Sequence, residues 1–248
     1  MKVLISGIGG RMGGEIARLA REGFRDAELV AGYDIAPLSL PDCPTYTDWN
    51  DVAERPDVII DFSHHAATPA LLAFATARNI PTLIATTAHT EDELSAIRAA
   101  ATQIPVFHAA NMSLGVALLA ELAKAAVRLY PHADVEIVEK HHNRKLDAPS
   151  GTALHLANAI RTVRNDATLN CGRSGNAKRA PSEIGIHAVR MGNIVGEHEI
   201  LIGTDTETIT LKHEAHSRAL FAEGALAAAA FLAKQDAGLY DMTDIIRL

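Results

Sequence analysis

The residues best suited to chemistry gather in one short stretch, residues 139–152 of a 248-residue chain, which reads Glu-Lys-His-His-Asn-Arg-Lys-Leu-Asp-Ala-Pro-Ser-Gly-Thr. A histidine can deliver a proton near neutral pH because its unperturbed pKa is about 6.5. Ser150, Gly151 and Thr152 open an apolar helical pattern, and a helix start offers N–H groups and a positive dipole end to a carboxylate. With Lys145 and one of the two histidines, they predict a pocket for a small dianionic ligand. A capped helix beside a solvated charged strand would use the same residues, and the pattern leaves that alternative open.

The spacing of the histidines bears on metals and on geometry. His141 and His142 are adjacent, so in a strand they would face opposite sides and could not bind one metal ion. The chain also lacks the His-Glu-x-x-His and Cys-x-x-Cys patterns of zinc sites, so no metal is expected. In a straight strand the Cα atoms of His141 and Lys145 would lie roughly 13 Å apart, at ~3.3 Å per residue. The chain must therefore bend at Asn143 and Arg144 if both side chains are to reach one small substrate.

The elements around this stretch predict an α+β domain. Helical spacing of apolar residues predicts helices over Leu114–Tyr130 and from about Thr152 to Val163. Alternating apolar residues predict strands over Asp134–Glu139, Gly185–Arg190, Ile194–Ile202 and Thr206–His213, with a polar stretch over residues 165–182. The reactive stretch then lies where a strand leaves the sheet and a helix begins, a rigid rim on which catalytic groups are often found.

The first residues predict a phosphate-binding turn. An apolar run, Val3–Ser6, is followed by Gly-Ile-Gly-Gly-Arg-Met-Gly-Gly at residues 7–14 and then by apolar residues at helical spacing. Such a turn brings the backbone close to a pyrophosphate, whose charge then lies at the helix N-terminus. The pattern departs from Gly-x-Gly-x-x-Gly at its last position, which is Met12. A glycine-rich turn with no ligand remains the alternative.

The second predicted strand, Leu29–Tyr33, ends in Asp34, where an acidic residue accepts hydrogen bonds from the adenine ribose. Residues 35–38 contain no arginine or lysine for the 2′-phosphate of NADP, which the Asp34 carboxylate would repel. We therefore expect NADH to be preferred, with NADPH possible. Asp34 as the mere start of a turn is the alternative.

The pattern then alternates between strands and helices, which implies a doubly wound parallel sheet of the Rossmann type. Strands are expected over Val58–Phe62, Thr82–Thr87 and Val106–Phe107, and helices over about Ala66–Arg78 and Glu91–Ala101. Ligands bind beyond the carboxyl ends of such strands. Residues at these ends are candidates to contact the cofactor: Phe62, Ser63, Thr86, Thr87 and Asn111. Helix capping is the common alternative for a serine or threonine there.

Changes of pattern predict two domains. We expect residues 1–112 plus 218–248 to form a dinucleotide-binding domain, which a helix over Arg218–Lys234 returns to cover. Residues 113–217 are expected to form an inserted domain for substrate binding and oligomerisation.

Composition narrows the class of partner. The net charge is −7 and 21% of residues are charged, which does not favour nucleic acid or an acidic membrane and leaves a small soluble ligand. The two cysteines, Cys43 and Cys171, stand far apart without metal spacing, which suggests a reducing cytosol. No apolar segment reaches the length of a membrane span, so we expect a cytoplasmic protein.

The sequence of residues 141–153, His-His-Asn-Arg-Lys-Leu-Asp-Ala-Pro-Ser-Gly-Thr-Ala, resembles the signature of the 4-hydroxy-tetrahydrodipicolinate reductases (dihydrodipicolinate reductases), enzymes of the diaminopimelate route to lysine. The likeness extends over the whole chain, and its other motifs fall in the expected order. They are Gly7–Gly13, Asp61–Ser63, Ala109–Asn111, Val195–His198 and Asp241–Met242. The resemblance implies an NAD(P)H-dependent oxidoreductase of lysine biosynthesis that acts on a cyclic dicarboxylate and assembles as a homotetramer through the strand-rich domain.

The resemblance also implies roles for individual residues. His141 would give the proton as hydride reaches the substrate ring, Lys145 would be its partner, and His142, Gly151 and Thr152 would hold a carboxylate. Arg218 would have a structural or hinge role. Cofactor contacts would come from three segments, with residues Gly7, Ile8, Gly9, Gly10, Arg11, Met12, Ala85, Thr86, Thr87, Ala109, Ala110, Asn111 and Met112.

One segment departs from the family pattern. Where the family commonly has Gly-Thr-Thr-Gly, this chain has Ala85-Thr86-Thr87-Ala88, so methyl groups replace hydrogens close to the expected nicotinamide. Two other functions stay open: a non-catalytic NAD-sensing protein, and a related dehydrogenase of another imino or amino acid. His141 and Lys145 argue against the sensor, because sensing requires no proton donor.

Overall fold

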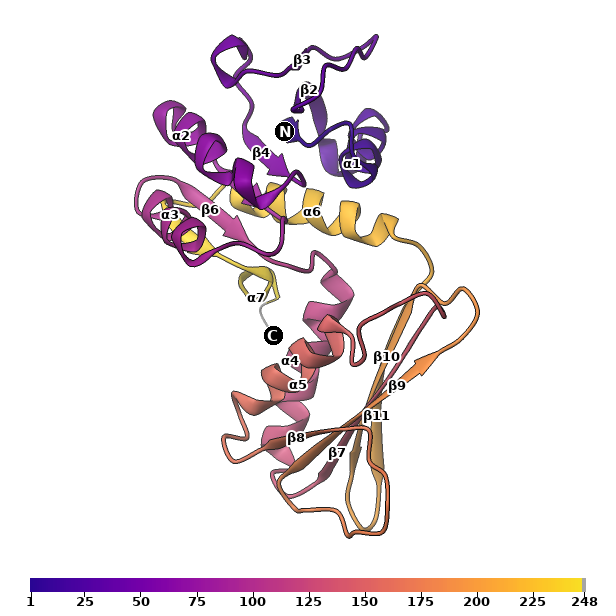
Figure 1. Cartoon of the computed structure of the whole chain (residues 1–248). Helices are drawn as coiled ribbons and strands as arrows, with labels where there is room; N and C mark the ends of the chain where they lie inside the picture. Colours follow the sequence, from indigo (N-terminus) through magenta and orange to yellow (C-terminus); the bar gives the residue numbers. More distant parts are fainter. Residues whose placement is uncertain (247–248) are drawn as a thin grey trace. The chain divides into compact units, whose positions relative to one another are not determined.

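The structure is a computed structural model that describes residues 1–246. Residues 247–248, which fall in the predicted dinucleotide-binding domain, lie outside the described residues. Over the described residues the chain forms two compact units (Figure 1). The first comprises Met1–Ser113 and the segment that begins at Ala219, and the second comprises Leu114–Arg218.

The first unit is built on a parallel sheet that has seven strands within residues 1–246, in the order β12-β6-β5-β4-β1-β2-β3. The strands are β1 (Lys2–Ser6), β2 (Glu28–Tyr33), β3 (Thr45–Tyr46), β4 (Val58–Asp61), β5 (Thr82–Ile84), β6 (Pro105–His108) and β12 (Gly238–Tyr240). The strand order changes direction between β1 and β4, which confirms the predicted doubly wound sheet.

Helices cover this sheet because its central strands are apolar on both faces. The helices are α1 (Arg11–Arg21), α2 (Thr68–Arg78), α3 (Glu91–Ala101), α6 (Ala219–Leu232) and α7 (Met242–Ile245), with 3₁₀ turns η1 (Phe24–Asp26), η2 (Trp49–Asp51) and η3 (His65–Ala67). Every residue of β4 is buried, as expected for a strand covered on both faces. Helix α1 packs with α6, and α2 packs with α3 (Figure 1). Helix α6 also contacts β4, β5 and β6, so it does return to the first unit as predicted.

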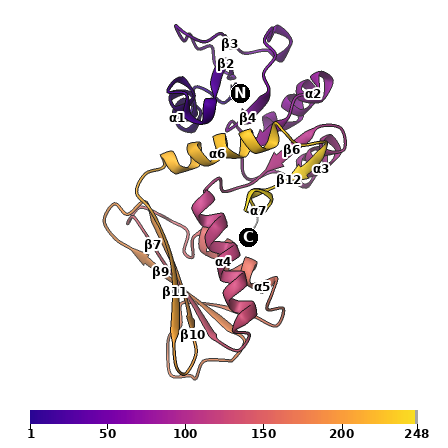
Figure 2. The same cartoon turned by 180° about the vertical axis from the view of Figure 1, so that it is seen from behind.

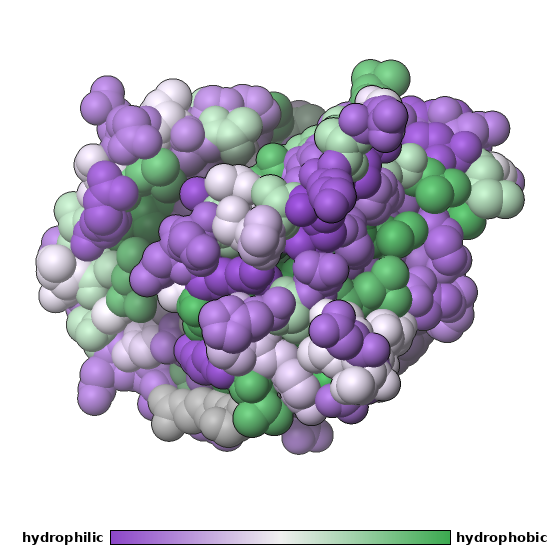
Figure 3. Space-filling view, turned by 90° about the horizontal axis from the view of Figure 1, so that it is seen from below, coloured by the Kyte–Doolittle hydropathy of each residue, from purple (hydrophilic) through white to green (hydrophobic). Residues whose placement is uncertain are grey.

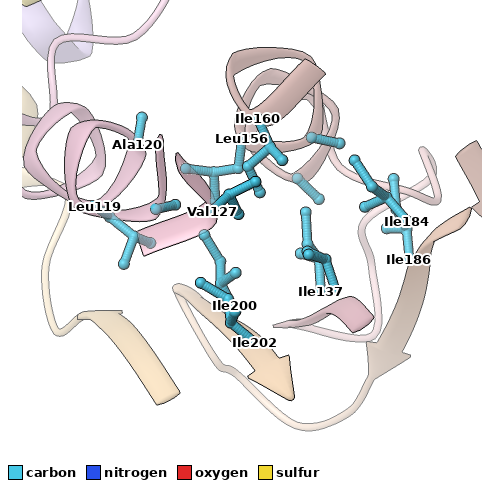
Figure 4. Close-up of a cluster of buried hydrophobic side chains, with 14 of the residues drawn as sticks. Leu119, Ala120, Val127, Ile137, Leu156, Ile160, Ile184, Ile186, Ile200 and Ile202 are labelled. Carbon is cyan, nitrogen blue, oxygen red and sulfur yellow. The ribbon is translucent and has the colours of Figure 1, made fainter. Parts of the chain in front are cut away.

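The second unit has a mixed sheet, five-stranded in the described part of the chain, in the order β11-β10-β7-β9-β8. Its strands are β7 (Asp134–His141), β8 (Thr168–Cys171), β9 (Glu183–Arg190), β10 (Gly196–Gly203) and β11 (Thr208–Ala215). Helices α4 (Leu114–Leu129) and α5 (Gly151–Arg161) lie on one face of this sheet (Figure 2). Leu119, Val127, Leu156 and Ile160 from the helices meet isoleucines of β7, β9 and β10 in a hydrophobic core (Figure 4).

Some elements differ from those predicted. β5 ends at Ile84, and residues 85–88 leave the sheet as a loop in which Ala88 has φ +66°. β7 continues to His141 because Lys140 still pairs with β10, and His141 pairs with β9. The polar stretch 165–182 contains the edge strand β8, and β3 and β12 are two further short strands that the pattern did not predict.

The described residues contain neither a membrane-spanning helix nor a cluster of metal ligands. No helix within residues 1–246 is long and apolar enough to cross a membrane. In the same residues, no three histidine, cysteine, aspartate or glutamate side chains are grouped so as to hold a metal ion. Cys43 and Cys171 are free thiols. Hydrophilic and hydrophobic residues intermingle on the surface that Figure 3 shows.

Candidate active site

Strand β7 places the first of the predicted catalytic residues. Its residues alternate between exposed or half-buried and buried positions, so Glu139 and His141 lie on the face that also carries Val135 and Ile137. Glu139 is completely buried and His141 is 9% exposed. A carboxylate and a histidine two residues apart on one strand face are thus brought together at the end of the strand.

Glu139 forms the centre of a hydrogen-bond network. Its Oε2 atom lies 2.6 Å from Nδ1 of His141. Arg190 binds both carboxylate oxygens, with Nη1–Oε2 2.8 Å and Nη2–Oε1 2.7 Å. The backbone N–H of Ser150 donates to Oε1 at 3.0 Å. Burial raises the pKa of Glu139, but these hydrogen bonds outweigh it and the net effect is to lower the pKa, so this carboxylate is ionised at neutral pH.

Two residues of strand β10, Gly196 and His198, lie against the His141 ring. The His198 ring meets the His141 ring edge to face, with centroids 5.2 Å apart, and its Nε2 lies 3.2 Å from Oγ of Ser150. A Cβ atom at Gly196 would lie 3.1 Å from Nε2 of His141, so glycine leaves room for this ring. Burial lowers the pKa of His198 to about 4, which keeps its ring neutral near pH 7.

The chain turns sharply after His142, as the predicted geometry required. The N–H of Lys145 donates to the carbonyl of His142 at 3.1 Å, which closes a turn over Asn143 and Arg144. His142 donates its own N–H to the carbonyl of Ile194 at 2.8 Å. Burial and the nearby cations of Arg144 and other residues lower the pKa of His142.

The N-terminus of α5 has the features expected of a carboxylate site. Ser150 is the N-cap, and its Oγ accepts the N–H of Ala153 at 3.1 Å. A carboxylate of the chain itself already uses neighbouring groups, because Oδ1 of Asp147 lies 2.8 Å from Nζ of Lys145. The hydrogen bond to Lys145 is the largest of the effects that lower the pKa of Asp147, and the N–H of Gly151 adds to it. Lys145 and the start of α5 can therefore hold one carboxylate between them.

The first unit contains the predicted phosphate-binding turn. Gly7 has φ +80°, a conformation that glycine adopts without strain, and a Cβ atom there would lie 2.9 Å from the backbone of Phe62. A Cβ atom at Gly13 would lie 2.1 Å from the carbonyl oxygen of Gly7, so no other residue fits at that point of α1. The backbone at Gly9 and Gly10 is exposed where α1 begins.

Asp34 lies beside this turn. Its carboxylate accepts the N–H of Gly9 at 2.9 Å and that of Ala36 at 3.3 Å. A cavity of about 500 Å³ opens here, lined by glycines, apolar side chains and a few polar ones. Its lining includes Gly7, Gly9, Gly10, Tyr33, Asp34, Ile35, Leu38, Phe62 and Ser63. A volume within the range of small-ligand pockets, with one carboxylate at its edge, fits the adenosine part of a dinucleotide.

The other predicted cofactor residues fall into exposed and buried groups. Ile8, Ala85, Thr86 and Met112 are buried. Arg11, Thr87 and Ala110 are exposed, and Met12, Ala109 and Asn111 are half-buried. The Thr86 hydroxyl is engaged within the protein, 3.4 Å from the Asp61 carboxylate and 3.1 Å from Nε2 of His89. Thr86 thus supports the loop rather than offering a free hydroxyl.

All the predicted cofactor residues lie in the first unit, and His141, Lys145 and the predicted substrate residues lie in the second. Four residues that contact the site had no predicted role, namely Glu139, Arg190, Gly196 and His198. The two-residue period of a strand places Glu139 on the face of His141 and could have identified it. The others come from neighbouring strands.

Known proteins match the chain along its whole length. The family models described as "Dihydrodipicolinate reductase, N-terminus" and "Dihydrodipicolinate reductase, C-terminus" match residues 1–112 and 115–246. The 4-hydroxy-tetrahydrodipicolinate reductase of Caldanaerobacter subterraneus subsp. tengcongensis is 47% identical, covering 100% of this chain and 98% of the relative. That of Clostridium novyi is 42% identical, covering 99% and 98%.

A solved structure is similar to this chain over its whole length. The dipicolinate-bound dihydrodipicolinate reductase of Paenisporosarcina sp. TG-14 superimposes with a TM-score of 0.86 at 26% identity, covering 99% of each chain. Because both halves of the chain match the family and relatives above 40% identity span it from end to end, the chain belongs to the dihydrodipicolinate reductase family.

Proposed function

We propose that this protein reduces 4-hydroxy-tetrahydrodipicolinate (or dihydrodipicolinate, its dehydrated form) to tetrahydrodipicolinate with a reduced pyridine nucleotide, in the diaminopimelate route to lysine. The hydroxyl group of the 4-hydroxy compound leaves as water. The observation that supports it most strongly is the pairing of a proton donor with a carboxylate site in one strand-turn-helix segment. His141 ends the strand against Glu139, and Lys145 and the N-terminus of α5 follow within a few residues.

The substrate class follows from charge. The contacts of Asp147 support a role for Lys145 and Gly151 in holding a substrate carboxylate, since they already accommodate one carboxylate of the chain. We propose that Ser150, Thr152 and His142 complete this site. The Paenisporosarcina relative is described with dipicolinate bound, a planar dicarboxylate of the same class.

The proton is proposed to leave from Nε2 of His141. Its Nδ1 atom is engaged by Glu139, so Nε2 is the ring nitrogen left for the substrate. Lys145 neutralises negative charge on the substrate, and this stabilises the bound substrate beside the buried His141. His198 is neutral near pH 7 and adds no positive charge against the protonated His141 ring.

The first unit, predicted as residues 1–112 plus 218–248, is proposed to bind the cofactor, and residues 113–217 the substrate. When bound, the nicotinamide would supply a hydride. The turn at Gly7, Gly9 and Gly10 would hold the pyrophosphate, and Asp34 the adenine ribose. Because Asp34 is a carboxylate and Ile35 follows it, we propose that NADH is preferred over NADPH.

Assembly as a homotetramer through the sheet of the second unit remains a proposal, as does a cytoplasmic location. Strand β11 lies at an edge of the sheet, and exposed residues alternate along it with half-buried ones. Thr210 and Lys212 are among the exposed residues. An edge strand presents unpaired backbone groups to which another chain can add.

The test follows NADH absorbance with freshly generated substrate. Wild type should oxidise NADH, and His141→Ala and Lys145→Ala should each lose most of the kcat. An inactive wild type would favour a non-catalytic NAD-binding protein. Unchanged rates in both variants would contradict the proposed roles of His141 and Lys145.

A further inference from the structure

We propose that Glu139, clamped by Arg190, is a positioning residue that fixes the tautomer and orientation of His141 and also anchors the start of α5. The role in turnover rests on the proposed reductase function. The claim about the tautomer does not, because it concerns the structure of the protein alone.

The Glu139 carboxylate is charged and buried, so its oxygens need hydrogen-bond donors. A buried carboxylate is costly unless donors surround it, and among the described residues four donors converge on this one. They are Nη1 and Nη2 of Arg190, the N–H of Ser150 and Nδ1 of His141. An ionised carboxylate only accepts hydrogen bonds, so the proton in the 2.6 Å contact belongs to Nδ1 of His141. The neutral ring must therefore carry its proton on Nδ1 and present Nε2 unprotonated.

The same carboxylate organises the anion site. Oε1 of Glu139 holds the N–H of Ser150, the N-cap of α5. Arg190 also donates to the carbonyl of Asp147 at 2.7 Å, so it fixes the loop that carries Lys145. The ion pair between buried Glu139 and half-buried Arg190 thus ties the proton donor to both parts of the carboxylate site. Gly196 completes the arrangement by leaving space beside Nε2.

The first test is the tautomer of His141 in the wild-type protein. Nitrogen-15 NMR of the histidine rings, with His141→Gln to assign the signal, should show the proton on Nδ1 at a pH where the ring is neutral. A ring that carries its proton on Nε2 overturns the proposal. This test needs no change at Glu139, so it stands even if variants there fail to fold.

The second test compares Glu139→Gln with Glu136→Gln. A glutamine at 139 keeps its shape, and its oxygen should stay with the two donors at the Oε1 position, Ser150 and Arg190. Its NH₂ then faces Nη1 of Arg190, which cannot accept a hydrogen bond, and Nδ1 of His141, which can. The NH₂ therefore donates to Nδ1, which moves the ring proton to Nε2. Glu136 is a matched control on the same strand, since it too pairs with an arginine, Arg179 at 3.0 Å.

We expect Glu139→Gln to lower kcat by about 10- to 100-fold, by analogy with the range found when a carboxylate that orients a metal-ligating histidine is mutated. KM should change by less than about threefold, because the serine cap at the start of α5 is kept. Glu136→Gln should change neither kcat nor the tautomer.

The outcomes separate the two claims. An unchanged tautomer and a kcat within twofold of wild type in Glu139→Gln would overturn the positioning role. If wild type proves inactive while its His141 carries the proton on Nδ1 and Glu139→Gln reverses this, the proposed reductase function fails and the positioning role stands.

Discussion

Replacing Asp34 by asparagine tests how the protein selects its cofactor. The Asp34 carboxylate lies at the edge of the cavity of about 500 Å³ and accepts the N–H of Gly9 at 2.9 Å. Asparagine keeps an oxygen for that hydrogen bond and removes the charge, and its NH₂ group replaces the oxygen that accepts the N–H of Ala36 at 3.3 Å. The 2′-phosphate of NADPH carries about two negative charges.

The size of the effect follows from Coulomb's law. At a separation of roughly 6 Å, one negative charge opposes a doubly charged phosphate by about 1.4 kcal/mol in water, and by more where the site excludes solvent. A difference of about 1.4 kcal/mol corresponds to a tenfold change in kcat/KM. Wild type should therefore prefer NADH over NADPH by at least about tenfold, and Asp34→Asn should reduce this preference by about tenfold.

The assay measures kcat/KM for both cofactors and, independently, their dissociation constants. Trp49 is the only tryptophan in the sequence and stacks on Tyr33 at 3.8 Å, next to Asp34, so its fluorescence can report nucleotide binding. Asp57→Asn is the control, because Asp57 also accepts a backbone N–H, that of Lys2 at 2.7 Å, and does not line the cavity. A wild-type preference for NADPH, or an unchanged ratio in Asp34→Asn, would refute the argument.

Three other predictions concern stability and substrate affinity. Ala88→Gly should raise the free energy of unfolding in urea by about 0.5–1 kcal/mol, because Ala88 has φ +66°, whereas Ala96→Gly within α3 should lower it by about 1 kcal/mol. Asp147→Asn should lower KM up to about fivefold at constant kcat. The reason is that a substrate carboxylate no longer has to displace the Asp147 carboxylate from Lys145, an exposed ion pair that contributes up to about 1 kcal/mol. A higher KM would contradict this. His198 has a pKa of about 4 in the folded protein, so the unfolded chain gains its proton first as pH falls from about 6.5. Stability should therefore fall by up to about 3 kcal/mol over that range through this group, and His198→Gln should flatten the dependence of unfolding free energy on pH.

The sequence predicted the parallel sheet because buried parallel strands contain continuous apolar runs, such as Val-Ile-Ile at residues 58–60 of β4, and because glycines mark the turn into α1. The edge strands β8 and β12 were not predicted, since each is short and pairs on one side only. Their pairing depends on the rest of the sheet rather than on their own residues.

In the candidate site too, local sequence predicts only the residues that lie close together along the chain. His141, Lys145 and Ser150 lie within one short stretch, so their chemistry and the bend between them follow from local sequence. Arg190 lies opposite His141 through the pairing of β7 with β9, and its side chain binds Glu139. His198 lies opposite Glu139 through the pairing of β7 with β10. That register joins strands that lie far apart in the sequence, so no local pattern contains it.

The most direct test of the central claim identifies the product. Wild-type protein would be incubated with NADH carrying deuterium at both C4 positions and with freshly generated 4-hydroxy-tetrahydrodipicolinate, and the product examined by mass spectrometry. The proposed function predicts one tetrahydrodipicolinate per NADH oxidised, with one deuterium in each product molecule. No deuterated tetrahydrodipicolinate, or NADH oxidation only with another imino or amino acid, would contradict it.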